Sequence, residues 1–227
     1  MKKGIRSAAL VLAVGMYSTT AYASDEGDWY VAASGTASLL NDSHTVIGPI
    51  PVPPGYAETE NRMDTGYGAQ LAIGRRIGNA RVEIEGGYTD NKSKHYTAIV
   101  PPTGDIASEG GHKAWRAMAN VYYDFGSGDF RPYLGGGIGY ADIKARFFAA
   151  RAPFPNEAPF LIMNDHKGEF AYQAMAGVAY QLSARVALTA QYRWLSAGKV
   201  HFRDLAGVGH VREHKGSNID VGIRFGF

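Results

Sequence analysis

The segment GSNIDVGIRFGF, residues 216–227, alternates hydrophobic with polar or small residues over its whole length. The hydrophobic positions are Ile219, Val221, Ile223, Phe225 and Phe227. Because successive side chains of a β-strand point to opposite faces, this spacing predicts a strand with one apolar face and one polar face. A strand with an apolar face needs neighbouring strands to pair with, and the rest of the chain contains segments with the same pattern.

The same period of two recurs along the chain from residue 29 onward. Glycine-containing or polar turn signals separate some of these segments, as at Gly78-Asn79 and between Gly126 and Asp129. None of the segments is long and apolar enough to cross a bilayer as a helix. The pattern predicts eight strands, at about 29–39, 67–74, 81–88, 115–125, 130–142, 170–182, 186–194 and 216–227.

The connections between these strands alternate strictly in length. Those after the second, fourth and sixth strands are short, whereas the others form long loops at about 40–64, 91–112, 143–168 and 196–215. In an up-and-down barrel, alternate connections lie at the same end, and outer-membrane barrels have short periplasmic turns and long extracellular loops. The sequence therefore predicts an all-β fold: an eight-stranded antiparallel transmembrane barrel with long extracellular loops.

The two faces of the predicted strands differ in charge and in aromatic content. The apolar faces carry aromatic residues near both strand ends, which suits the two bilayer interfaces. A soluble barrel of the lipocalin kind would turn its apolar face inward around a ligand instead, but it would have little reason to place aromatics at both rims. We expect the apolar faces to meet lipid and the polar faces to line the lumen, including Arg81, Glu83, Glu85, Arg116, Asp124, Arg193, Asp220 and Arg224.

The N-terminal residues predict export. A basic start, a short apolar run and the small-x-small site Ala21-Tyr22-Ala23 indicate a signal peptide over residues 1–23, which leaves 24–227 as the barrel domain. Loss of Lys2, Lys3 and Arg6 lowers the 23 Lys+Arg to 20, against 21 Asp+Glu, so the near-neutral mature chain gives no indication of nucleic-acid binding. The absence of cysteine excludes disulfides and thiolate metal sites.

An eight-stranded lumen is just wide enough to be filled by side chains, and buried charges there are costly unless they are paired. We therefore expect a barrel-interior charge network in which Glu83 and Glu85 pair with some of Arg116, Arg193 and Arg224. The bare glycines at 135, 137 and 139 would make room for these long side chains. Hydration of the charges by lumenal water is the alternative.

Several segments resemble a known family. MANVYYDFG (118–126), RPYLGGGIGYA (131–141), FAYQAMAGVAYQLS (170–183), LTAQYRWL (188–195) and NIDVGIRFGF (218–227) are similar to the opacity-type, outer-membrane-protein-A-like small barrels of Gram-negative bacteria. The resemblance implies location in the outer membrane and delivery to the outer-membrane barrel insertion machinery. In this class that machinery reads a last strand ending in an aromatic residue, a role that would fall to Phe225 and Phe227.

Two motifs suggest catalysis without supporting it. His210-Val211-Arg212-Glu213-His214 matches the H-x-x-E-H metalloprotease pattern, but that chemistry needs both histidines on a helix, and we expect a solvated loop here. Ser43-His44 lies in a proline-rich loop, and adjacency in sequence does not position a nucleophile against its base. We expect no enzyme activity, no catalytic residues, no metal and no cofactor.

The third long loop is unusually apolar for chain that faces water. Its candidate interaction patch comprises Phe147, Phe148, Phe154, Phe160 and Leu161. Exposed apolar patches usually mark an interaction surface, although these residues would equally suit extended strands or a cover over the barrel mouth.

The main functional hypothesis is a surface-interaction protein, adhesin-like or supporting envelope integrity. Its loops would contact lipopolysaccharide, a host surface or another protein, while the barrel sits in outer-membrane lipid. The alternative is a narrow porin-like channel for small solutes or ions.

Overall fold

The computed structural model describes residues 29–40, 43–51, 54–100, 104–106, 108–126, 128–149 and 160–227. The predicted signal peptide, residues 1–23, lies outside this part of the chain. No helix among the described residues has the length and hydropathy needed to cross a membrane. The strands are β1 (Trp29–Leu40), β2 (Ser43–Pro51), β3 (Pro54–Met63), β4 (Gly66–Ile77), β5 (Ala80–Val100), β6 (Gly104–Ile106), β7 (Ser108–Asp124), β8 (Phe130–Ala149), β9 (Phe160–Gln181), β10 (Val186–Arg203) and β11 (Gly209–Gly226).

Eight of these strands form a closed ring, which confirms the predicted fold class. Its order is β1, β4, β5, β7, β8, β9, β10 and β11, and β11 pairs back with β1. All pairings are antiparallel, and the closing one runs in unbroken register from Tyr30 opposite Gly226 to Leu40 opposite Gly216. The segment that ends in Phe227 is therefore the strand that removes the free sheet edge, which is a requirement for a sheet in lipid.

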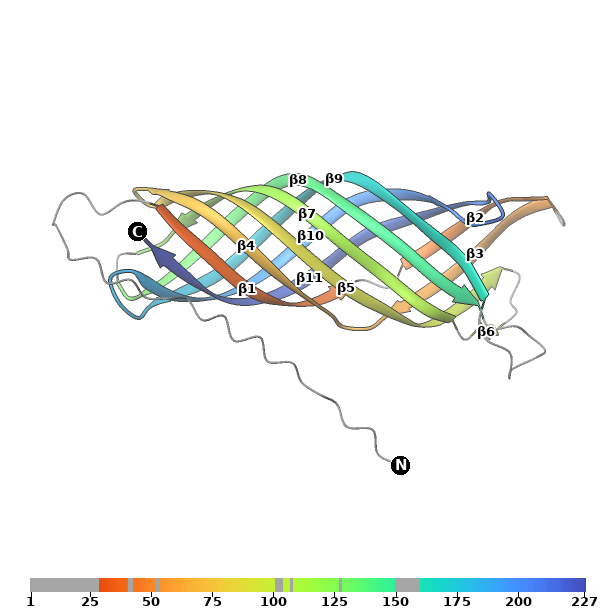
Figure 1. Ribbon diagram of the computed structural model, residues 1–227, viewed down its shortest axis with the longest axis horizontal. Helices are drawn as coiled ribbons and strands as arrows, with labels where there is room; N and C mark the ends of the chain where they lie inside the picture. The colour runs from red at the N-terminus through yellow and green to blue at the C-terminus, as the bar shows by residue number, and fades with distance from the viewer. Residues whose placement is uncertain are drawn as a thin grey trace, which may run out of the picture.

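The short turns gather at one end of the barrel, as predicted. The β4–β5, β7–β8 and β9–β10 connections lie there together with the start of β1 and the end of β11, on the left of Figure 1. Gly78, in the β4–β5 turn, has a φ of 62°, a left-handed conformation that suits glycine. We call this the short-turn end and the opposite one the long-loop end.

The prediction of four long loops is wrong for most of their length. Strand β5 continues to Val100, β8 to Ala149 and β10 to Arg203, so the chain stays in the sheet well beyond the predicted strand ends. The reason is that the alternation of buried and exposed residues continues there, with Ile143 fully buried and Val200 likewise. The first connection forms a hairpin, β2–β3, that inserts between β11 and β5 beyond the ends of β1 and β4, on the right of Figure 1.

The apolar faces point outward, as expected. Leu71 is 67% exposed, Ile84 61% and Val221 63%. Aromatic residues mark both ends of this belt, with Trp115 and Tyr140 at the long-loop rim and Trp29 and Phe125 at the short-turn rim. Outward-facing charges begin directly beyond the long-loop rim, so the membrane-spanning part ends at this rim. We call the strand segments beyond it the extension.

Candidate functional site

The centre of the lumen holds an ion-paired network built around Glu85. The Glu85 carboxylate accepts hydrogen bonds from Arg193 Nη1 at 2.6 Å and Nη2 at 2.8 Å, and it lies 3.4 Å from Arg116 Nε. Arg193 also donates from Nε to Asp220 at 2.9 Å. Strands β5 and β10 lie four places apart in the ring of eight, so the Glu85–Arg193 pair spans the lumen from wall to wall. The side chains of this network are almost fully buried.

Glu83 takes different partners from those expected. Its carboxylate accepts hydrogen bonds from the hydroxyls of Tyr30 (3.0 Å) and Tyr122 (3.3 Å) and from Asn120 Nδ2 (3.3 Å). No arginine within the described chain forms an ion pair with Glu83. The tyrosines and Asn120 were missed because their alternation alone does not indicate which lumenal groups meet.

A second buried ion pair lies nearer the short-turn end. Arg81 Nε is 2.9 Å from Asp124 Oδ2, and its guanidinium lies over the ring of Tyr122 at 4.5 Å. The sequence placed Arg81 and Asp124 on the lumenal face, but it gave no reason to join them. Arg224, a member of the predicted network, has no ion pair with a carboxylate of the described chain, and its Nε has no hydrogen-bond partner.

The lumenal glycines of β8 leave space for side chains of β7 and not for the arginines. A Cβ on Gly137 would overlap the Asn120 amide, and one on Gly135 would overlap the ring of Tyr122. The clearance for an arginine comes from Gly87 instead, where a Cβ would lie 2.9 Å from Arg116 Nε. The expectation that Gly135, Gly137 and Gly139 make room for the arginines was therefore wrong, because the space that they leave is taken by side chains of the adjacent strand, Tyr122, Asn120 and Met118.

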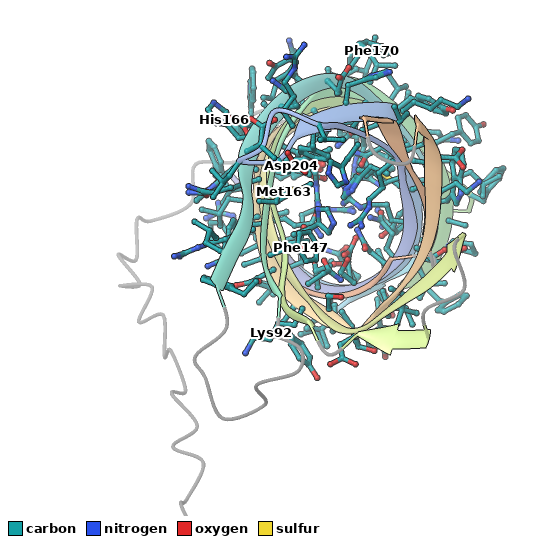
Figure 2. The ribbon with its side chains drawn as sticks, turned by 90° about the vertical axis from the view of Figure 1, so that its right-hand side faces the viewer. Lys92, Phe147, Met163, His166, Phe170 and Asp204 are labelled. Carbon is teal, nitrogen blue, oxygen red and sulfur yellow. The ribbon has the colours of Figure 1, made fainter. Side chains whose placement is uncertain are left out.

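Between the charge network and the long-loop end, apolar side chains fill the barrel. Their cluster includes Phe147 and Met163, which point into the interior in Figure 2. Two cavities in the described lumen are small, about 50 Å³ beside the charge network and about 20 Å³ nearer the long-loop end. Such cavities hold only a few water molecules. The remaining members of the cluster are Ala114, Met118, Ala141, Ile143, Ala145, Ala171, Ala197, Val200 and Phe202.

A basic cluster lies in the extension: His112 is on β7, three residues beyond the rim residue Trp115, and Arg212 and His214 are on β11. The Nη1 of Arg212 contacts Nε2 of His112, and the His112 and His214 rings lie 6.1 Å apart. Burial and the nearby Arg212 lower the pKa of His112 well below its usual range. Burial, Arg212 and Arg116 lower the pKa of His214 to about 4. Both histidines are therefore neutral at physiological pH.

The H-x-x-E-H motif lies on β11, which corrects the expectation of a solvated loop. His210 and His214 are buried on the inner face, whereas Glu213 is exposed on the outer face and is 3.0 Å from Lys215 Nζ. His210 Nε2 instead lies 3.0 Å from Asp204 Oδ2. Strand geometry thus separates the glutamate from the histidines, and no group of three metal-ligating side chains forms within the described residues.

The predicted loop patch is divided between the two faces of the sheet. Phe147 is 4% exposed inside the barrel, and Phe148 lies on the outer face beneath the guanidinium of Arg146. Leu161 is half-buried on β9, whereas Phe154 and the side chain of Phe160 lie outside the described residues. In place of a continuous apolar patch, the outer face of the extension carries charged and polar side chains, and Lys92 and His166 point outward in Figure 2.

The comparison with known families identifies the barrel. The model of the outer membrane protein beta-barrel domain matches residues 8–225. The chain belongs to this family. The outer membrane protein PagN of Salmonella typhimurium is 26% identical over 210 residues, which cover 87% of this chain and 85% of PagN.

Solved structures share the fold of this outer membrane protein beta-barrel. OprG of Pseudomonas aeruginosa superposes with a TM-score of 0.60 at 12% identity, covering 89% of this chain and 97% of OprG. The Escherichia coli outer membrane protease OmpT gives a TM-score of 0.53 at 8% identity, covering 92% and 99%. At these identities the likeness shows the fold alone. The protein resides in the Gram-negative outer membrane, where the short-turn end faces the periplasm and the extension faces outward.

Proposed function

We propose that this outer membrane protein is a non-conducting, non-enzymatic scaffold that presents its extension to anionic partners at the cell surface. The observation that carries the proposal is the combination of a filled lumen with an extension built from paired strands. Ion pairs occupy the membrane-spanning part of the lumen, and the apolar cluster fills the level above it. A solute could pass through the lumen only if the ion-paired side chains and the apolar cluster both moved apart.

The extension is long enough to reach past the membrane surface. Strand β9 runs about ten residues beyond the rim residue Phe170, which corresponds to about 30 Å along the strand. Six strands of the ring share this continuation, and the β2–β3 hairpin fills the space between β11 and β5, whereas β9 and β10 pair with each other only as far as Tyr172 and Ser196. A sheet of this kind offers a fixed surface in place of separate flexible loops.

The charge of the outer surface favours an anionic partner. Among the side chains described on this face, cations outnumber acids seven to three. Lys113 is paired with Asp90 at 3.3 Å, and Lys215 is paired with Glu213, which leaves a net positive surface. The cations are Lys92, Lys113, Lys144, Arg146, Lys199, Arg203 and Lys215, and the acids are Asp90, Asp142 and Glu213.

Binding of purified protein to immobilised dextran sulfate tests this surface. Replacing Lys144 and Arg146 with glutamate should weaken retention at least tenfold at low salt, because it reverses two neighbouring charges. Arg131→Glu is the matched control, since Arg131 lies at the short-turn end. Equal retention of all three proteins would refute the anionic-partner proposal. Comparing adhesion by cells that carry the same variants then relates the surface to function.

The signal peptide and the insertion signal belong to the same proposal. Residues 1–23 would direct export, and Phe225 and Phe227 would direct insertion. Phe225 lies on the lipid-facing side of β11 and is 44% exposed, and Phe227, directly after the end of β11, is 55% exposed, so an insertion factor would have access to both.

A further inference from the structure

A cavity of about 250 Å³ opens at the short-turn end, between the ends of β4 and β11 and the β9–β10 turn. Three arginines line it, Arg76, Arg185 and Arg224, and its lining includes no aspartate or glutamate side chain. Apart from the carboxylate of Phe227, which forms no ion pair with these three arginines, the lining supplies no counter-charge, and like charges that converge repel one another. The arrangement is therefore one that an anion would stabilise.

Arg224 is the decisive member of this cluster. It is only 7% exposed, and its Nε has no hydrogen-bond partner. Its guanidinium lies over the rings of Tyr30 at 5.1 Å and Tyr133 at 5.9 Å. The nearby Arg81 and Arg193 each have a carboxylate at 2.9 Å, whereas no such pair forms for Arg224 within the described chain. A buried cation in this state is costly unless a ligand completes its hydrogen bonds.

The other two arginines complete the site from different elements. Arg76 ends the inward-facing row of β4 and is half-buried, and Arg185 is exposed in the β9–β10 turn. A guanidinium presents several N–H donors in a plane, a geometry that matches two oxygens of a phosphate. A phosphate group within this cavity would therefore lie among three matched donors.

The rim of the cavity indicates where the phosphate comes from. Trp29 and Phe227 line the same cavity, and both are lipid-facing, 46% and 55% exposed. Aromatic side chains in this position lie at the level of the lipid headgroups. The cavity therefore opens at the membrane surface and not only toward bulk water.

We propose that this cavity binds the phosphodiester of an anionic phospholipid headgroup in the periplasmic leaflet. Arg224 contacts the phosphate from the lumenal side, and Arg76 and Arg185 contact it from the mouth. The contact fixes one lipid at the junction of β1 and β11. The proposal is independent of the extracellular surface proposed above, because the two sites lie at opposite ends of the barrel.

Native mass spectrometry of the folded protein, released from vesicles of mixed phosphatidylglycerol and phosphatidylcholine, tests the proposal. We expect wild-type barrels to retain phosphatidylglycerol in preference to phosphatidylcholine. Arg224→Gln should reduce this retention at least tenfold. Because Arg224 is buried and its variant risks misfolding, the double variant Arg76→Gln/Arg185→Gln provides a second arm with substitutions at the mouth only.

Arg75→Gln is the matched control, because Arg75 lies next to Arg76 but faces outward, 5.9 Å over the ring of Trp29. This control should retain lipid as the wild type does. Equal retention by the wild type and the double variant, or equal retention of the two lipids, would overturn the proposal. Complete displacement of the lipid by millimolar inorganic phosphate would also overturn it, because the site would then be one for free phosphate.

Discussion

Glu85→Gln is the substitution that tests the lumenal network most sharply. It keeps the size of the side chain and removes the charge that faces both Arg193 and Arg116. Arg193 retains Asp220 at 2.9 Å and the Gln173 side-chain oxygen at 2.8 Å. Arg116 loses the one carboxylate with which it pairs in the described chain. The substitution therefore leaves an uncompensated cation in a buried position.

Breaking a buried pair by removing one partner costs about 3–5 kcal/mol. We expect a loss of this size in the free energy of unfolding for Glu85→Gln, measured by urea titration in lipid vesicles with tryptophan fluorescence as the signal. Adding Arg116→Met should recover part of the loss, because it removes the unpaired cation. Glu213→Gln is the control, since its pair with Lys215 is exposed and such pairs contribute about 0–1 kcal/mol. A loss below about 1 kcal/mol for Glu85→Gln would refute the network and favour charges hydrated by lumenal water.

Three further predictions concern other parts of the chain. Val221→Arg should cost about 2–4 kcal/mol in the same titration, because this side chain faces mid-bilayer hydrocarbon; an unchanged midpoint would contradict the face assignment. The folded protein keeps His112 and His214 neutral, so stability should be intact above the unfolded pKa of about 6.5 and should fall as the pH drops toward 4, by up to about 3 kcal/mol for His214 alone. Hydrogen exchange in the extension should record this loss, and a flat pH profile would exclude it. Deletion of Phe227 should impair assembly in cells more than refolding in detergent, and equal effects would argue against the insertion signal.

The ring could be predicted because membrane barrels impose a strict period of two. In β11, for example, the alternation alone divides the residues into two faces. The face that includes Val221 meets lipid, and the face that includes Asp220 lines the lumen. The extension was missed because water-facing loops were expected wherever charge returned to the outer face. Lys144 is such a charge, yet its neighbours Ile143 and Ala145 are fully buried inside the barrel.

The pairing of side chains inside the lumen could not be predicted from the sequence for a different reason. Which residues meet across a barrel depends on strand order and on the stagger between strands, and a single sequence does not record the stagger. Glu85 and Arg193 were expected to take part and do contact each other, but the same reasoning paired Glu83 with an arginine, and no such ion pair forms in the described chain. The asparagine and tyrosine partners of Glu83 carry no charge signal that would have indicated them.

Single-channel recording in planar bilayers tests the central claim most directly. The proposed scaffold has a lumen closed by the Glu85–Arg193 pair and by the apolar cluster above it. We expect folded wild-type protein to give no steady openings across the voltage range that the bilayer tolerates. Steady, reproducible openings of the wild type, with a conductance that changes in Arg193→Gln, would contradict the account and establish a channel.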